Sequence, residues 1–163
     1  MSRVPVFALT SLAVLLATAG CASSASGGTA SGKATGSAKP VKVEAAGVPG
    51  VGKVLVTSKG YTLYMFAPDN HRAVTCTGTC AGTWPPLMLP AGAAPLAGSG
   101  VKQSLLGSAP DPEGGRVVTY NGWPLYGYTG DVQPGQATGQ DIDLNGGDWY
   151  VMRASGQPLV PAL

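Results

Sequence analysis

The sequence has little charge. Only 11% of its 163 residues are Asp, Glu, Lys or Arg, well below the average of about a quarter. From Val51 onward the chain carries six basic and seven acidic residues, so no basic stripe is available to neutralise phosphates. Phosphate neutralisation supplies most of a protein's affinity for nucleic acid. We therefore expect no nucleic-acid partner.

Histidine and cysteine are scarce as well. His71 is the only histidine, which excludes a blue-copper site because such a site needs two. Cys76 and Cys80 are separated by three residues and Ala81 follows, whereas covalent haem and thioredoxin-type sites need two cysteines separated by two residues. No nucleophile elbow or activated serine is apparent. We expect no catalytic residues, no enzymatic activity and no cofactor.

Long apolar runs are few, and the main one lies at the N-terminus. Residues 4–19 are predominantly apolar, follow Arg3 and end in small residues before Cys21. Such a run is typical of a signal peptide and is short for a membrane span. We therefore predict a signal peptide at residues 1–20. Cys21 after Ala-Gly resembles the lipobox of bacterial lipoproteins, where an acylated Cys becomes the mature N-terminus, although Thr18 stands where that pattern favours Leu.

Residues 21–50 are rich in Ala, Gly, Ser, Thr and Lys. Residues 22–46 contain no aromatic side chain, so they cannot bury enough apolar surface to offset the entropy of ordering. We predict a lipidated Cys21 followed by a flexible linker of roughly 25–30 Å r.m.s. span. Acyl chains on Cys21 would hold the protein at the outer face of the bacterial cytoplasmic membrane. Without them the protein would be secreted.

Glycine and proline are abundant, at 25 and 14 residues. They disfavour long helices, because Gly costs about 1 kcal/mol and Pro about 3 kcal/mol in a helix interior. One phrase also occurs twice, at an offset of 62 residues: residues 54–69 read VLVTSKGYTLYMFAPD and residues 116–131 read RVVTYNGWPLYGYTGD. We predict a mainly β, compact single domain at residues 51–163, built from two tandem hairpin-plus-strand repeats at about residues 51–92 and 114–157.

Each copy of the phrase predicts a strand, a two-residue turn and a return strand. Residues 59–60 and 121–122 are the predicted turns, and Asn-Gly at the second is the strongest short hairpin signal because a type I′ turn needs positive φ at both positions. The return strand of the first copy should place its aromatic residues on one face and the others opposite, as Tyr64 with Phe66 against Leu63 with Met65. Residues 87–100 and 108–115 are interpreted as loops.

Beyond the hairpin each copy reaches a tryptophan. In the second copy, residues 148–156, which include Trp149, read as a further strand that ends in a turn. Trp84 is followed by two prolines, which a central strand does not accept. One hairpin alone is marginally stable in water, so we expect the two copies to pack their apolar faces together into one core.

These residues point to a family. Residues 64–69 and 126–131 both match Tyr-x-(Phe/Trp/Tyr)-x-x-Asp. Together with CTGTCAGTWPPL at residues 76–87 and TGQDIDLNGGDWYVMRASG at residues 138–156, they resemble the bacterial lipoproteins called "secreted repeat of unknown function". The resemblance covers roughly residues 51–156. It implies an extracytoplasmic location and a tandem-repeat architecture, and it assigns no biochemical role.

The two cysteines of the domain predict a disulfide. Outside the cytoplasm, thiols at this spacing are expected to oxidise, and Gly78 between them lets the chain bend enough to bring Cys76 and Cys80 together. A loop this short contributes roughly 2 kcal/mol by chain entropy. A zinc site that adds Asp69 and His71 to the cysteines is an alternative with which oxidation competes.

The repeated motif residues have two interpretations: Tyr64, Phe66 and Asp69 in the first copy, and Tyr126, Tyr128 and Asp131 in the second. Each Asp enters a turn, where its side chain can accept backbone N–H bonds. A buried Tyr hydroxyl also needs a partner, so we hypothesise that each motif Tyr donates to the motif Asp of one repeat or the other. The alternatives are a ligand or metal site at the paired acids, and an exposed aromatic platform for cell-wall glycan.

The acidic run DIDLNGGD at residues 141–148 follows the start of a calcium loop. Asp141, Asp143, Asn145 and Gly146 fit the pattern D-x-D-x-N-G. Position 12 is then Met152 instead of the bidentate Glu, and a strand is predicted where a helix should follow. The run is therefore either a solvated loop or a weak calcium site completed by Asp148.

We conclude from the sequence that this is a lipid-anchored envelope protein whose domain is a non-enzymatic binding or structural module. An envelope protein or a cell-wall glycan is the expected partner, beside the membrane itself. The first alternative is an exported redox or metal-handling accessory protein, which would need Cys76 and Cys80 to cycle. The second is a hydrolase, for which Asp69 and Asp131 are the only plausible acid pair.

Overall fold

The computed structural model describes residues 39–71 and 73–162 of the chain. These residues contain ten short strands, one α-helix and two 3-10 helices. These residues belong to one compact unit, Thr35–Leu163. The mainly β class predicted from the sequence is confirmed. The elements, in chain order, are β1 (Lys42–Val48), β2 (Gly52–Thr57), β3 (Tyr64–Phe66), η1 (Ala67–Asp69), α1 (Thr79–Thr83), β4 (Met88–Leu89), β5 (Leu96–Ala97), η2 (Gln103–Leu105), β6 (Leu106–Pro110), β7 (Arg116–Tyr120), β8 (Trp123–Pro124), β9 (Ile142–Asp143) and β10 (Asp148–Val151).

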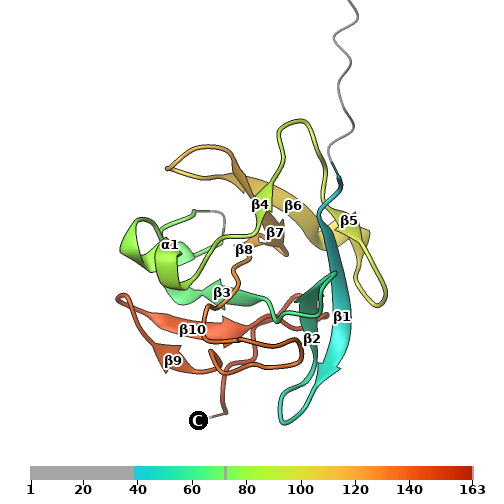
Figure 1. Cartoon of the computed structure of the whole chain (residues 1–163), viewed down its shortest axis with the longest axis vertical. Coiled ribbons are helices and arrows are strands. Elements are labelled where there is room, and N and C mark those ends of the chain that lie inside the picture. The colour runs from blue at the N-terminus through green and yellow to red at the C-terminus, as the bar shows by residue number, and fades with distance from the viewer. Residues whose placement is uncertain (1–38, 72, 163) are drawn as a thin grey trace, which may run out of the picture. The chain divides into compact units, whose positions relative to one another are not determined.

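The strands form three small sheets (Figure 1). β1 lies between β2, its antiparallel neighbour, and β5, its parallel neighbour. β10 lies between β3 and β9 and is antiparallel to both. β7 pairs with β4, β6 and β8, always antiparallel.

The two repeats exchange their third strands. The tryptophan segment of the second repeat, β10, pairs with β3 in the first repeat, where Trp149 lies opposite Phe66. The tryptophan segment of the first repeat continues into β4, which pairs with β7 in the second repeat, where Met88 lies opposite Val117. Each hairpin is therefore completed by a strand from the other copy, and neither hairpin-plus-strand unit is self-contained.

The backbone hydrogen bonds repeat this exchange on both sides. In one half, Leu55 N donates to Met152 O at 2.8 Å, and Met152 N donates to Leu63 O at 3.0 Å. The other half has the equivalent bonds, from Val118 N to Leu87 O at 2.9 Å and from Leu87 N to Leu125 O at 2.8 Å. Where the halves meet, the backbones of the two motif tyrosines exchange two hydrogen bonds. Tyr64 N donates to Tyr126 O at 2.9 Å, and Tyr126 N donates to Tyr64 O at 3.0 Å.

The predicted alternation of the return strand is confirmed, and both of its faces are buried. Tyr64 and Phe66 belong to one apolar cluster and Leu63 and Met65 to another. The first cluster also contains both core tryptophans. The second gathers aliphatic side chains from both repeats, among them Leu55, Val118, Leu125 and Met152. The two copies thus build one core with two faces, as the sequence predicts.

Three local expectations need correction. The segment expected to be flexible linker up to residue 50 contains β1, whose Val43 and Val48 are buried and whose six residue pairs with β2 run from Val43–Thr57 to Val48–Gly52. The β domain therefore begins before residue 51. Residues 87–100 and 108–115, expected to be loops, contribute β4, β5 and most of β6, and Pro110 is tolerated because it ends an edge strand.

The turns follow the glycine pattern. Asn121 and Gly122 both have positive φ, 49° and 82°, as a type I′ turn requires. At the corresponding turn of the first copy, Gly60 has positive φ, 83°, and Lys59 does not. The Gly60 N–H donates to Thr57 O at 2.8 Å, and Thr57 N donates to Tyr61 O at 2.8 Å. This turn is therefore one residue longer than predicted.

Candidate functional site

Four aromatic rings form a stacked column through the centre of the domain. Trp84 and Trp149 are parallel within 2°, with ring centroids 4.0 Å apart. Phe66 stacks on the outer face of Trp149 at 4.2 Å, and Tyr128 stacks on the outer face of Trp84 at 4.1 Å. Each tryptophan therefore lies against a motif ring of the other repeat. The stacked rings therefore connect the segments that the two repeats exchange.

The motif tyrosines and aspartates are paired between the repeats. Tyr64 Oη donates to Asp131 Oδ2 and Tyr126 Oη donates to Asp69 Oδ2, both at 2.6 Å. Both tyrosines are fully buried, and Asp69 and Asp131 are 0% and 5% exposed. The hypothesised Tyr–Asp bond is present, and it joins each Tyr to the Asp of the other copy.

The remaining carboxylate oxygens hold the chain that follows each motif. Asp69 Oδ1 accepts hydrogen bonds from Thr75 N at 2.8 Å and from Thr75 Oγ1 at 2.6 Å. Asp131 Oδ1 accepts the same pair from Thr138, at 2.8 and 2.7 Å. All four carboxylate oxygens thus have partners inside the fold. The two acids act as clamps for the loops that lead to the tryptophans.

Burial shifts the ionisation of this network. Loss of hydration raises the pKa of Tyr64 and of Tyr126 far above the ordinary value, and the carboxylate that each hydroxyl faces raises it further. Burial also raises the pKa of Asp69, against the opposing effect of the hydrogen bonds from Thr75 and Tyr126. The tyrosines therefore stay protonated and keep donating across the ordinary pH range.

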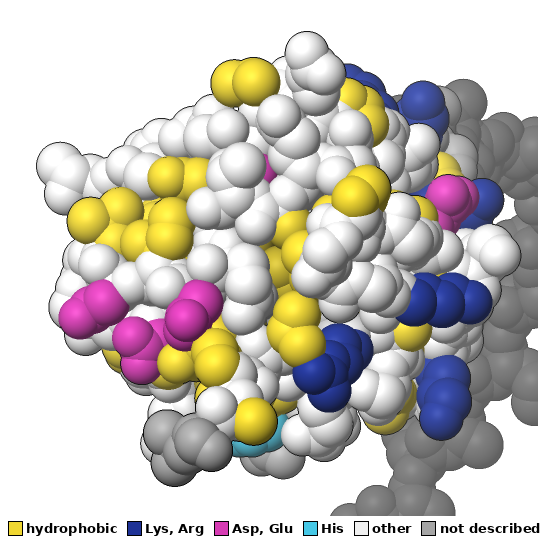
Figure 2. Space-filling view, turned by 90° about the horizontal axis from the view of Figure 1, so that it is seen from below, with side chains coloured by type: hydrophobic (Ala, Val, Ile, Leu, Met, Phe, Trp, Pro, Cys, Tyr) yellow, Lys and Arg dark blue, Asp and Glu magenta, His cyan; other side chains and the backbone are white. Residues whose placement is uncertain are grey.

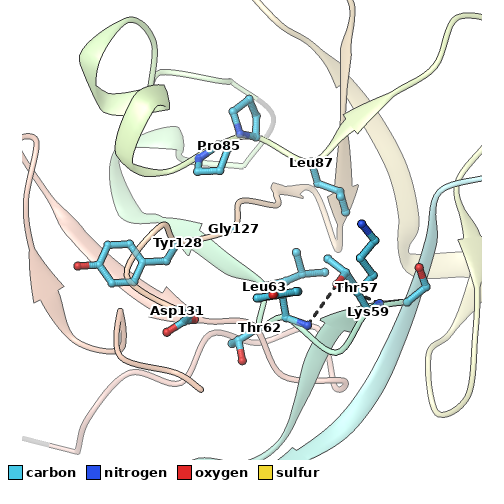
Figure 3. Close-up of a pocket in the computed structure, with 12 residues that line it drawn as sticks. Thr57, Lys59, Thr62, Leu63, Pro85, Leu87, Gly127, Tyr128 and Asp131 are labelled. Carbon is cyan, nitrogen blue, oxygen red and sulfur yellow. Dashed lines mark hydrogen bonds between the residues drawn. The ribbon is translucent and has the colours of Figure 1, made fainter. Parts of the chain in front are cut away.

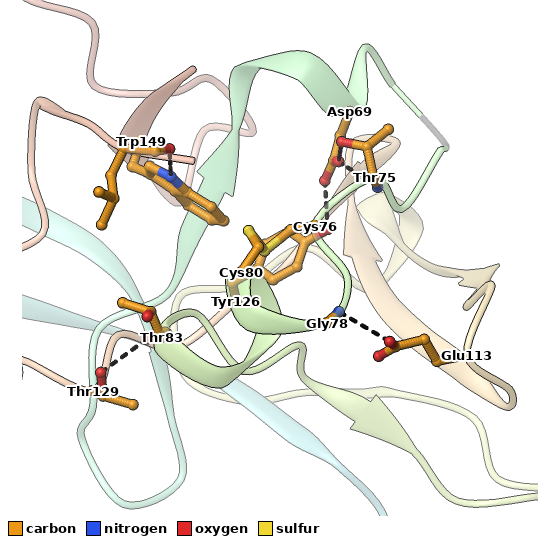
Figure 4. The surroundings of a disulfide bond; sticks show 11 residues. Asp69, Thr75, Cys76, Gly78, Cys80, Thr83, Glu113, Tyr126, Thr129 and Trp149 are labelled. Carbon is orange, nitrogen blue, oxygen red and sulfur yellow. Dashed lines mark hydrogen bonds between the residues drawn. A yellow bond between two sulfur atoms is a disulfide. The ribbon is translucent and has the colours of Figure 1, made fainter. Parts of the chain in front are cut away.

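A disulfide lies in the same apolar cluster as the column. Cys76 and Cys80 are bonded with their Cα atoms 5.2 Å apart, and they are 2% and 8% exposed. The bridge lies beside the ring of Tyr126 (Figure 4). It joins Cys76, which precedes α1, to Cys80 within α1. Trp84 follows α1 directly, and its backbone N–H donates to Cys80 O at 2.8 Å. The disulfide thus fixes the helix that positions Trp84.

The two tryptophans differ in their indole partners. Trp149 Nε1 donates to Leu144 O at 3.0 Å. Trp84 Nε1 is buried and has no hydrogen-bond partner, alone among the buried side-chain polar atoms of the described residues.

A groove opens beside the outer ring of the column. It has a volume of about 480 Å³ and lies between the turn after β2, the Pro-Pro segment and the end of the second motif (Figure 3). Its lining is mainly apolar: Thr57, Ser58, Lys59, Tyr61, Thr62, Leu63, Pro85, Pro86, Leu87, Gly127, Tyr128 and Asp131. Of the predicted site residues it brings together Tyr128 and Asp131. The repeated segments at residues 59–69 and 121–131 do not predict this groove from the sequence.

The acidic run forms the turn of a β-hairpin. Asn145 and Gly146 have φ of 61° and 90°, and Leu144 N donates to Gly147 O at 3.1 Å. They form the tight turn of the β9–β10 hairpin, in which Asp143 lies opposite Asp148. Within residues 39–71 and 73–162, no group of three or more His, Cys, Asp or Glu side chains is placed to hold a metal ion.

This outcome also bears on the zinc alternative and on His71. The disulfide occupies both cysteines of that alternative. The exposed ring of His71 lies 4.1 Å from that of Trp123. On the face seen in Figure 2, several acidic side chains gather on the left, and basic side chains lie on the right with a further acidic side chain among them.

The chain is similar to one described protein family. Residues 48–88 and 107–153, just over half of the chain, match the family model described as "Secreted repeat of unknown function" (Lipoprotein_15). The chain belongs to this family. Its two matched segments correspond to the two interlocked repeats. Neither a curated protein nor a solved structure gives a significant match.

Membership of the secreted-repeat family establishes a secreted, lipoprotein-type protein. The predicted signal peptide at residues 1–20, the lipidated Cys21 and the first part of the linker lie outside the described residues. Among those that are described, no helix has the length and hydropathy needed to cross a bilayer.

Proposed function

We propose that this chain is a lipid-anchored protein of the bacterial cell envelope and that its β domain is a non-enzymatic binding module. Family membership and the N-terminal sequence, with Cys21 directly after Ala-Gly, support the location and the anchor. The observation that carries the binding role is the groove, whose volume of about 480 Å³ lies within the range of small-molecule sites, about 300–1,000 Å³.

The arrangement of the acids supports binding over hydrolysis. Asp69 and Asp131 are the only pair that the sequence offers for acid–base work, and both are committed to hydrogen bonds with Tyr and Thr side chains. The redox alternative needs Cys76 and Cys80 to exchange with a partner. Their sulfurs are buried, which disfavours exchange because thiol attack needs access.

Two experiments test the proposal. Membrane fractionation of cells that express the full chain should place it with the membrane, and Cys21→Ser should release it. For binding, the chain from Ala22 onward is titrated with the small-molecule fraction of an envelope extract and with soluble cell-wall glycan fragments, while amide NMR signals are followed. Shifts confined to Tyr61, Leu63, Leu87 and their neighbours support the groove. Shifts elsewhere, or none, contradict it.

A further inference from the structure

One residue that lines the groove differs between the two repeats. At the offset of 62 residues, Gly127 is the counterpart of Met65. Met65 is 2% exposed and belongs to the aliphatic cluster, against which Trp123 and Tyr150 pack. Gly127 instead lines the groove. The second repeat therefore lacks the side chain that fills the equivalent place in the first.

The backbone does not require glycine at this position. Gly127 is absent from the residues with positive φ, so a side chain would not be strained. A Cβ there would meet only Pro85, at 3.7 and 3.9 Å from its Cγ and O atoms, which is ordinary contact distance. The fold therefore does not require glycine here, and the effect of Gly127 is to leave open space in the groove.

One end of the groove offers donors. Thr57 Oγ1 accepts hydrogen bonds from Lys59 N at 3.3 Å and Tyr61 N at 3.2 Å, so its hydroxyl proton remains available to donate. Lys59 and Ser58 beside it are exposed. The ion pair found among the described residues joins Lys42 to Glu44, which leaves the Lys59 ammonium without a carboxylate in that part of the chain. This end favours an anion.

The rest of the groove is apolar. Pro85, Leu87 and Leu63 line it, and Tyr128 lies with Asp131 on the side away from Lys59 (Figure 3). Asp131 is only 5% exposed, and its carboxylate oxygens accept hydrogen bonds from Tyr64 and Thr138. It therefore presents little charge to a ligand, and an apolar body can lie over this side.

We propose that the groove binds a small anionic amphiphile, an aliphatic carboxylate whose head lies at Thr57, Ser58 and Lys59 and whose chain lies toward Tyr128, and that Gly127 keeps the site open. This inference rests on the proposed binding function, because it names the ligand class of the same groove. The site consists of donors at one end and apolar wall at the other.

Isothermal titration calorimetry of the chain from Ala22 onward tests the inference, with decanoate as the probe and decanol as its uncharged counterpart. We expect decanoate to bind more tightly than decanol by about two- to fivefold, the effect of an exposed charge pair. Lys59→Met keeps the apolar stem and should remove that preference. Lys102→Met, at an exposed Lys outside the groove, should leave it unchanged.

Gly127→Met tests the site itself. This variant copies the residue of the first repeat and should weaken decanoate binding at least about tenfold, since it fills the space that the chain needs. Gly47→Met is the matched control, because Gly47 is exposed, has open space around its Cβ position and lies outside the groove. Melting temperatures of both variants show that the fold is kept.

The outcomes separate this inference from the proposed function. Equal binding of decanoate and decanol, or no effect of Lys59→Met, overturns the anionic ligand class and leaves a binding groove. Unchanged decanoate binding by Gly127→Met overturns the site. If neither probe binds while envelope fractions still shift the groove signals, the ligand class is wrong and the binding function stands.

Discussion

The crossed Tyr–Asp pairing can be tested by a double-mutant cycle. Tyr64→Phe removes a hydroxyl that donates at 2.6 Å to a buried carboxyl group. A hydrogen bond to a charged group contributes about 1.5–3 kcal/mol, and about 1 kcal/mol shifts the melting temperature of a domain of this size by about 4 °C. Tyr64→Phe should therefore lower the melting temperature by about 6–12 °C.

The cycle combines this change with either aspartate. With Asp131→Asn, the partner in the structure, the two changes should couple by at least about 1 kcal/mol. With Asp69→Asn, the Asp of the same repeat, the coupling should be within about 0.5 kcal/mol, because Tyr64 and Asp69 share no side-chain hydrogen-bond partner. Urea unfolding followed by tryptophan fluorescence gives the four free energies of unfolding in each cycle.

Two results of these cycles would contradict the crossed pairing. If Tyr64 couples more strongly to Asp69 than to Asp131, the pairing lies within each repeat and the exchange of contacts between copies is wrong. If neither aspartate couples, the hydroxyl is not part of a hydrogen-bonded pair that matters for stability. The mirror cycle of Tyr126 with Asp69 provides an independent repeat of the test.

Three further predictions concern stability. Because the pKa of Tyr64 and of Tyr126 is raised in the folded state, the unfolded chain loses these two protons above about pH 10 while the folded chain keeps them. The free energy of unfolding should therefore fall by about 2.7 kcal/mol per pH unit above that pH. Tyr126→Phe should halve this slope in urea titrations at several pH values. A chain that begins at Val51 lacks β1 and should melt well below one that begins at residue 39, and equal melting temperatures would show that β1 is dispensable. A Cβ on Gly139 would lie 2.7 Å from the buried Trp84 ring, so Gly139→Ala should lower the free energy of unfolding by about 1–3 kcal/mol in a calorimetric scan. Gly82 has open space around it, so Gly82→Ala should leave the stability unchanged in the same scan.

The repeat makes the core of this fold predictable from sequence. Alternation placed Tyr64 and Phe66 on one face, and the duplicated phrase predicted two copies that share a core. The chemistry of a buried hydroxyl predicted that each motif Tyr bonds a motif Asp. These features depend on local pattern and on the need to satisfy buried polar groups, and both can be read from a sequence.

The pairing between copies could not be predicted in the same way. Each tryptophan segment has the same local pattern whichever hairpin it completes, so sequence alone does not distinguish an exchanged strand from a retained one. The groove depends on an absent side chain at Gly127, which becomes visible only when its counterpart is seen to be filled. The Asn145-Gly146 turn is predictable from the sequence, since Asn-Gly is a hairpin signal.

The reciprocal exchange of third strands has a consequence for how such a chain can arise. A protein with a single copy of the repeat would leave its hairpin one strand short and its tryptophan without a stacking partner. It could meet both needs only by pairing with a second molecule of itself, as a symmetric homodimer. Duplication within one gene would then join the two subunits covalently and free one half to change, as Gly127 differs from Met65, without disturbing the other.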